Sequence, residues 1–121
     1  MELTQIVQPG RQIIERYGPT GFRVSGAIYL GPVLVFADRT VVWEEAAMTH
    51  EGLAAVVAHG GVELLLLGLG RRMVPVAAAL RASLKAKGIA VEAMDTGAAC
   101  RTYNVLLAED RRVAAALLPP V

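Results

Sequence analysis

The sequence is poor in cysteine, in unbalanced charge and in long apolar runs, and each shortage excludes a class of protein. The single cysteine, Cys100, cannot form an internal disulfide, which fits a reducing compartment. With 12 basic and 11 acidic side chains, the formal net charge of +1 offers no electrostatic footprint for nucleic acid or for an anionic membrane. The longest run without charge, 24–37, is too short to span a bilayer and contains glycine and proline. We therefore expect no nucleic-acid partner and no membrane span.

Hydrophobic residues make up 55% of the 121 residues, which predicts one densely packed domain over 1–121. Residues 1–10 lack a basic segment followed by an apolar one, so no signal peptide and a cytoplasmic location are expected.

The first third of the chain has the pattern of closely spaced strands. Short apolar or mixed segments alternate with glycine- and proline-containing turns, which is typical of an antiparallel meander. The predicted strands are 11–16, 21–24, 27–30 and 32–36, and a further one follows at 40–43.

From residue 62 onward, strands and helices alternate. A short helix over 51–58, capped by Thr49 and stopped by Gly60, precedes this part. The order β–α–β–α–β favours a parallel core with right-handed crossovers, hence an α/β protein. The predicted elements are a strand at 62–67, a helix at 75–87 ending at Gly88, a strand at 89–94, a helix from Asp95 or Thr96 to about Ala108, and a strand at 112–118.

Two loops carry the most unusual residues, and both follow predicted parallel strands. One is 68–72, with Gly68, Gly70 and Arg71, and the other opens the helix in 94–104, with Thr96 and Arg101. Ligands of open α/β sheets favour the carboxyl ends of strands, and glycines and helix starts suit anions. The sequence predicts an anion site there, with a tight glycine turn and solvated arginines as the alternative.

Three further side chains of 94–104 are weighed in the same way. Cys100 would be an activated thiol if the helix start and Arg101 lowered its pKa, or else a small core residue. Asp95 is a general base or, in the alternative, a helix cap. Asn104 either lines the predicted pocket or hydrogen-bonds backbone inside the domain. His50 and His59 lack the spacing and companions of metal ligands, so neither a metal nor a cofactor is expected.

Three segments resemble one known family. These are 16–26, Leu65 to Arg72, and above all Met-Asp-Thr-Gly-Ala-Ala-Cys-Arg-Thr-Tyr-Asn-Val-Leu at 94–106, with the tail 113–120 also similar. The chain resembles the small single-domain family of unknown function that includes the mitochondrial respiratory complex I assembly factor three and an adipogenesis-associated protein of animals, and it looks like a bacterial member. In 16–26, Ser25 stands where asparagine is expected in many members.

The resemblance implies a three-layer α/β fold, with an antiparallel hairpin layer beside a mixed, mainly parallel central sheet flanked by helices. It implies no established catalysis and a chaperone-like role in complex I assembly. The first hypothesis is therefore a non-catalytic interaction protein whose partners are complex I subunits or assembly factors, held near the inner membrane through such a partner. The alternative is a small-molecule or anion binder, or an enzyme, that uses the cleft between 68–72 and 94–104. A homodimer face is the third possibility.

Overall fold

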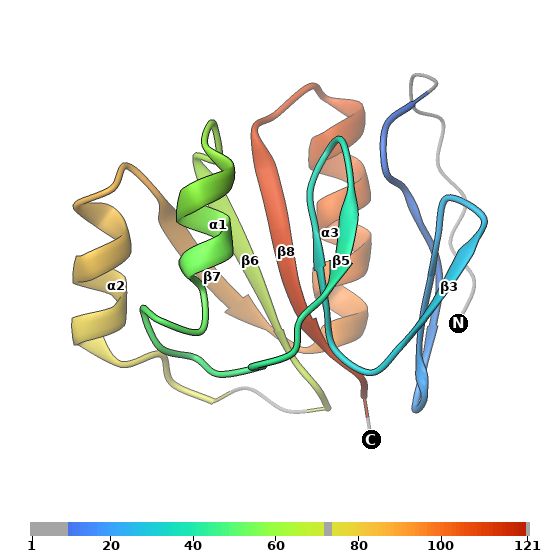
Figure 1. Cartoon of the computed structure of the whole chain (residues 1–121), viewed down its shortest axis with the longest axis horizontal. Helices are drawn as coiled ribbons and strands as arrows, with labels where there is room; N and C mark the ends of the chain where they lie inside the picture. Colours follow the sequence, from blue (N-terminus) through green and yellow to red (C-terminus); the bar gives the residue numbers. More distant parts are fainter. Residues whose placement is uncertain (1–9, 72–73, 121) are drawn as a thin grey trace.

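The computed structural model describes residues 10–71 and 74–120, and its first three strands form a small antiparallel sheet (Figure 1). These strands are β1 (Ile14–Gly18), β2 (Gly21–Val24) and β3 (Ala27–Leu30), in the order β1-β2-β3, and we call this sheet A. Ser25 and Gly26 join β2 to β3 with φ values of 45° and 84°. Such a two-residue left-handed turn matches the twist of a hairpin, and asparagine or glycine usually adopts it.

The meander predicted for the first third stops after three strands. β4 (Val33–Val35) leaves sheet A and pairs antiparallel with β5 (Thr40–Val42) on one side and with β8 (Val113–Leu118) on the other. β4 is buried along its whole length, which fits a strand that lies inside the central sheet with a neighbour on each edge. The local pattern of β4 resembles the preceding strands, and long-range pairing decides where it goes.

The second half forms the predicted parallel core, which we call sheet B together with β4 and β5. Its elements are α1 (Ala54–His59), β6 (Leu64–Leu69), α2 (Ala78–Lys85), β7 (Ala90–Met94), α3 (Thr96–Ala108) and β8. The strand order is β5-β4-β8-β6-β7, with β6 parallel to both β7 and β8. The expected mixed, mainly parallel central sheet is confirmed.

Two helices are shorter than the sequence predicts. The helix expected at 51–58 starts only at Ala54, because the Thr49 hydroxyl accepts the Gly52 N–H and caps a preceding turn instead. The helix expected at 75–87 starts at Ala78 without a side-chain cap. α3, by contrast, has the predicted start, and Asp95 is its N-cap.

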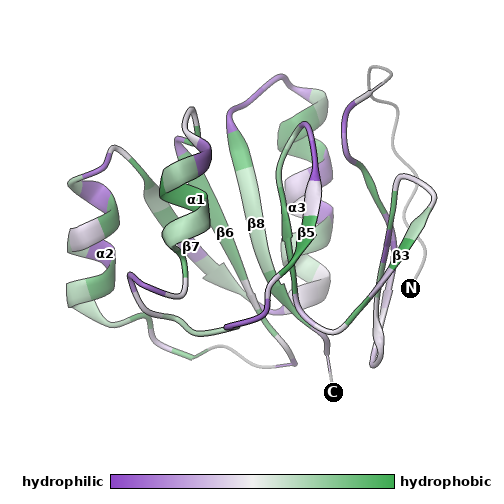
Figure 2. Ribbon diagram, viewed as in Figure 1, coloured by the Kyte–Doolittle hydropathy of each residue, from purple (hydrophilic) through white to green (hydrophobic). Residues whose placement is uncertain are grey.

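Sheet B has a separate hydrophobic core on each face. On one face, α3 and the inner side of sheet A pack against β4, β6 and β8. On the other face, α1 and α2 cover β6 and β7 (Figure 1). Hydrophobic residues run along β6 and β8 in Figure 2, whereas polar residues gather in loops and on outward helix faces. No helix in the described part of the chain is long and apolar enough to cross a membrane.

Candidate functional site

The two loops predicted to face each other do meet at the carboxyl edge of sheet B. The Thr96 N–H donates to the Gly70 carbonyl at 2.8 Å, and the Gly70 N–H donates to Thr96 Oγ1 at 2.8 Å. The same hydroxyl donates to the Leu118 carbonyl at 2.6 Å, and Thr96 is fully buried. One side chain thereby ties the ends of β6 and β8 to the start of α3.

The glycines of this edge allow close packing. A Cβ on Gly68 would lie 2.8 Å from Leu117 Cδ2 and 3.2 Å from the Thr96 Cα, so only glycine lets α3 lie so near β6. Gly70 has a φ of 83°, which favours glycine as well. Arg71 is exposed and its Nε donates to the Pro120 carbonyl at 3.5 Å, while Arg72 lies outside the described residues. These contacts support structural roles, and anion binding at this edge stays a prediction.

Three further polar side chains at the start of α3 or within it bind backbone or sheet A. Asp95 Oδ1 accepts the Ala98 N–H at 2.9 Å, which is the cap alternative for this residue. Asn104 is 2% exposed, and it accepts the Ile14 N–H at 3.0 Å and donates to the Ile14 carbonyl at 2.7 Å. Arg101 Nη1 donates to the Tyr17 hydroxyl at 3.4 Å. Asn104 therefore faces β1, away from the loop 68–72.

Cys100 lies in the core between α3 and the sheets and is fully buried. Burial raises the pKa of the Cys100 thiol to about 12, and this effect outweighs the opposite influence of Arg101. A thiol with such a pKa is neutral at physiological pH, and only the thiolate is an effective nucleophile. The geometry supports the core alternative for Cys100.

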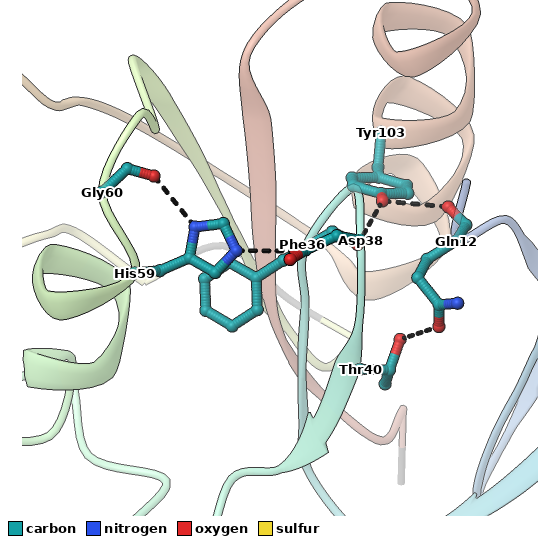
Figure 3. Close-up of polar contacts among 7 residues, drawn as sticks. All are labelled: Gln12, Phe36, Asp38, Thr40, His59, Gly60 and Tyr103. Carbon is teal, nitrogen blue, oxygen red and sulfur yellow. Dashed lines mark hydrogen bonds and ion pairs between the residues drawn. The ribbon is translucent and has the colours of Figure 1, made fainter. Parts of the chain in front are cut away.

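Tyr103 of α3 connects three segments of the chain (Figure 3). Its hydroxyl lies 2.9 Å from the Gln12 carbonyl and 3.2 Å from the Phe36 carbonyl, and it donates to them. Burial raises the pKa of Tyr103, so the hydroxyl keeps its proton and remains a donor. Gln12 in turn accepts from the Thr40 hydroxyl at 2.7 Å.

A charged groove of about 370 Å³, absent from the sequence-based predictions, lies beside this network. One wall contains His59, whose ring stacks on Phe36 with centroids 4.2 Å apart and whose Nε2 lies 2.7 Å from Asp38 Oδ1 (Figure 3). The hydrogen bond with His59 lowers the pKa of Asp38. The walls carry charges of both signs, from Arg11, Asp110, Arg111 and Arg112. No local sequence pattern predicts the groove, since Asp38 and His59 meet only through the packing of α1 on sheet B.

A second hollow, of about 270 Å³, lies on sheet A. Its lining includes Gly18 and Gly21 together with Arg23, Ile28 and Leu30. Ile28 and Leu30 are 75% and 73% exposed, which is high for such large apolar side chains. Within residues 10–71 and 74–120, no three histidine, cysteine or acidic side chains are grouped to hold a metal ion.

Fold and surfaces together define an α/β protein in which a three-stranded antiparallel sheet is added to a mixed central sheet. The chain belongs to the family described as "Protein of unknown function (DUF498/DUF598)", whose pattern matches residues 14–118. The family resemblance of the sequence is thereby confirmed.

Similar proteins include a bacterial one and several from animals. An uncharacterised protein of Rhodobacter capsulatus is 43% identical over 107 residues, covering 88% of this chain and 83% of the relative. The NADH dehydrogenase (ubiquinone) 1 alpha subcomplex assembly factor 3 of Danio rerio is 35% identical over 112 residues, covering 89% of this chain. The chain spans 64% of the length of that fish protein and 60% of its human counterpart.

Solved structures confirm the fold. An outer membrane protein from Bartonella henselae is 36% identical and superposes with a TM-score of 0.83 over 92% of this chain and 97% of its own. A Bordetella pertussis protein described as an Mth938-like domain is 28% identical, with a TM-score of 0.79 over 99% of this chain and 93% of its own.

Proposed function

We propose that this chain is a non-catalytic interaction protein in the biogenesis of respiratory complex I, the NADH dehydrogenase of the respiratory chain. The observation that carries this proposal is the 35% identity, over 89% of the chain, to a protein named as an assembly factor of that enzyme. The partners are subunits or other assembly factors of the complex, and the chain acts as a chaperone. Its place is the cytoplasm, at the inner membrane through such a partner.

The geometry of the predicted site supports a role without chemistry. Hydrogen bonds to backbone groups occupy the side chains of Thr96, Asn104 and Asp95. Cys100 is a buried neutral thiol. The two most exposed large apolar side chains of the described residues, Ile28 and Leu30, lie instead on sheet A, where a protein partner would bury them.

Deletion of the gene in its native host tests the proposal. We expect assembled NADH dehydrogenase, measured on native gels and by NADH oxidation in membranes, to fall under respiratory growth, and the wild-type gene to restore it. Cys100→Ala should restore it equally, because the proposed role needs no nucleophile. Normal amounts of assembled enzyme in the deletion strain would refute the proposal, and failure of a folded, soluble Cys100→Ala protein would argue for chemistry.

A further inference from the structure

The charged groove lies where two neighbouring strands of sheet B separate. The antiparallel ladder between β4 and β8 ends at the pair of Val35 and Ala115. Beyond this pair, the Ala37 carbonyl accepts the Gln12 N–H at 2.9 Å, and the Val113 N–H donates to the carbonyl two residues before it at 3.0 Å. Ala37 and Val113 both line the groove, which therefore opens at the amino ends of β6 and β8. This is the edge of sheet B opposite to the one where α3 begins.

Arg11, in the segment before β1, brings a buried donor without an acceptor into the lining of this groove. Its Nη1 donates to Asp110 Oδ1 at 3.0 Å, and no other described residue accepts a hydrogen bond from the guanidinium. Its Nε is buried and has no partner in the described part of the chain. The Nε–H and one Nη2–H of an arginine point to the same side, where together they match two oxygens of a carboxylate or a phosphate. Since nearly all buried polar groups of native proteins are hydrogen-bonded, an acceptor from outside the chain would satisfy this exception.

Both carboxylates in the lining already have partners. Asp38 is paired with His59 at 2.7 Å (Figure 3), and Asp110 is paired with Arg11. The two ring nitrogens of His59 face the Asp38 carboxylate and the Gly60 carbonyl, so neither nitrogen is available to exchange a proton with a ligand. The groove is therefore equipped to bind a ligand and not for acid–base catalysis by this histidine.

Two further arginines give the lining a surplus of positive charge. Arg111 and Arg112 are exposed side chains of the groove. Among residues 10–71 and 74–120, no carboxylate lies within ion-pair distance of Arg111. Arg112 Nη1 lies 3.5 Å from Glu63 Oε1, and these side chains are 69% and 66% exposed, so the pair contributes little. An anion in the groove would gain from these cations, whereas a cation would meet only carboxylates that are already paired.

We propose that the charged groove binds a small ligand through an oxyanion group, either a carboxylate or a phosphate. The oxyanion accepts hydrogen bonds from Nε and Nη2 of Arg11, and Arg111 and Arg112 add positive charge around it. The groove volume of about 370 Å³ is within the range of about 300–1,000 Å³ that is usual for small-molecule sites. Because Nε is buried, its acceptor has to enter the groove, which a small ligand can do and a flat protein surface cannot. This site goes beyond the proposed function, and it is distinct from the anion site predicted at 68–72 and 94–104.

Titration of the isotope-labelled full chain, followed by NMR, tests the proposal. The probes are inorganic phosphate in one arm and succinate in the other, in buffers whose ionic strength is kept constant with sodium chloride. The main signal is the Nε–H of Arg11, and the amides of Arg111 and Arg112 report on the rest of the groove. We expect saturable shifts at these groups with at least one probe at millimolar concentration, and the arm that saturates first distinguishes phosphate from carboxylate. Shifts that sodium chloride alone reproduces, or no saturation in either arm, would overturn the proposal.

Arg11→Lys keeps the positive charge but removes the paired Nε and Nη2 donors. This variant should bind the preferred probe roughly 10-fold or more weakly, as measured at the Arg111 and Arg112 amides, because a lysine cannot form the bidentate contact. Arg23→Lys, the same substitution on sheet A and outside the groove, is the matched control and should bind like the wild type. Wild-type affinity of a folded Arg11→Lys protein would overturn the proposal.

Asp110→Asn provides a variant that should gain affinity. It removes the carboxylate that lies beside Arg11, so an incoming anion meets less repulsion and should bind roughly 3-fold more tightly. Asparagine tolerates the left-handed backbone of this position, where φ is 62°, so the variant should fold. If Arg11 serves only to hold Asp110, Asp110→Asn would leave anion binding unchanged or weaken it, and this result would overturn the proposal even if Arg11→Lys fails to fold. All of these measurements use the purified chain, so their outcome does not depend on whether it acts in NADH dehydrogenase assembly.

Discussion

Replacing Asn104 with alanine tests whether one buried amide holds sheet A against α3. The substitution removes both hydrogen bonds to Ile14 and leaves a fully buried N–H and C=O without partners. Each unsatisfied buried group costs about 1–3 kcal/mol. We therefore expect Asn104→Ala to lower the free energy of unfolding by about 2–5 kcal/mol, a large share of the ~5–15 kcal/mol of a typical domain.

Urea and thermal unfolding followed by circular dichroism measure this loss, and the melting temperature should fall by roughly 10–25 °C. Hydrogen exchange at the Ile14 amide should accelerate as well. Val105→Ala, on the exposed side of the same helix, is the control and should stay within about 0.5 kcal/mol of the wild type. Asn104→Asp should also destabilise at neutral pH, because a buried carboxylate then faces the Ile14 carbonyl, and it should recover part of the loss on acidification. A loss below about 0.5 kcal/mol for Asn104→Ala would refute this account of the contact.

Three further predictions concern buried or paired groups. The hydrogen bond with His59 lowers the pKa of Asp38 below 3.8. The stability that this pair contributes is therefore present above pH 3.8 and is lost as the pH falls through the lowered pKa. Asp38→Asn should therefore lower the free energy of unfolding by at most about 1 kcal/mol near neutral pH, since Asp38 is largely exposed. The variant should also lose less stability than the wild type on acidification. Equal acid-unfolding profiles for Asp38→Asn and the control Glu92→Gln would contradict this. Because the pKa of Cys100 is raised from 9.0 to about 12, only the unfolded thiol ionises between these values, and stability should fall as pH rises through them. Iodoacetamide at pH ~8 should label Cys100 only after unfolding, since the thiolate is the reactive form, and labelling of the native protein at the unfolded rate would disprove its burial. Thr96→Val keeps the shape of the side chain but leaves two backbone partners unsatisfied, which should cost about 1–3 kcal/mol in urea unfolding; a neutral result would show that the hydroxyl is dispensable.

The elements with local signals were predictable from the sequence. α3 starts where Asp95 caps it, and the parallel strands β6, β7 and β8 follow from continuous apolar runs alternating with helical segments. The start of α2 was predicted from Pro75, yet the helix begins at Ala78. A proline is compatible with the first turn of a helix but does not oblige the chain to begin one there.

The features that depend on distant partners could not be predicted. β4 has the same short apolar pattern as the strands before it, and only its pairing with β8 places it in sheet B. Thr96 suits an anion site by its position at a helix start, but its hydroxyl contacts Leu118, which lies 22 residues away. The ring of His59 reaches Asp38 only because α1 packs over the end of β4.

The segment 94–106, on which the family resemblance mainly rests, serves to join the parts of the fold. Thr96 fixes the ends of β6 and β8, while Asn104 and Tyr103 bind backbone at Ile14, Gln12 and Phe36. A motif used in this way specifies how sheet A is mounted on sheet B, and it leaves Ile28 and Leu30 exposed on the outer face of sheet A. Partner binding on that face would then use a surface whose position α3 sets but whose side chains α3 does not touch. The same mounting could therefore carry different docking residues on β2 and β3, which is how one fold can serve different partners.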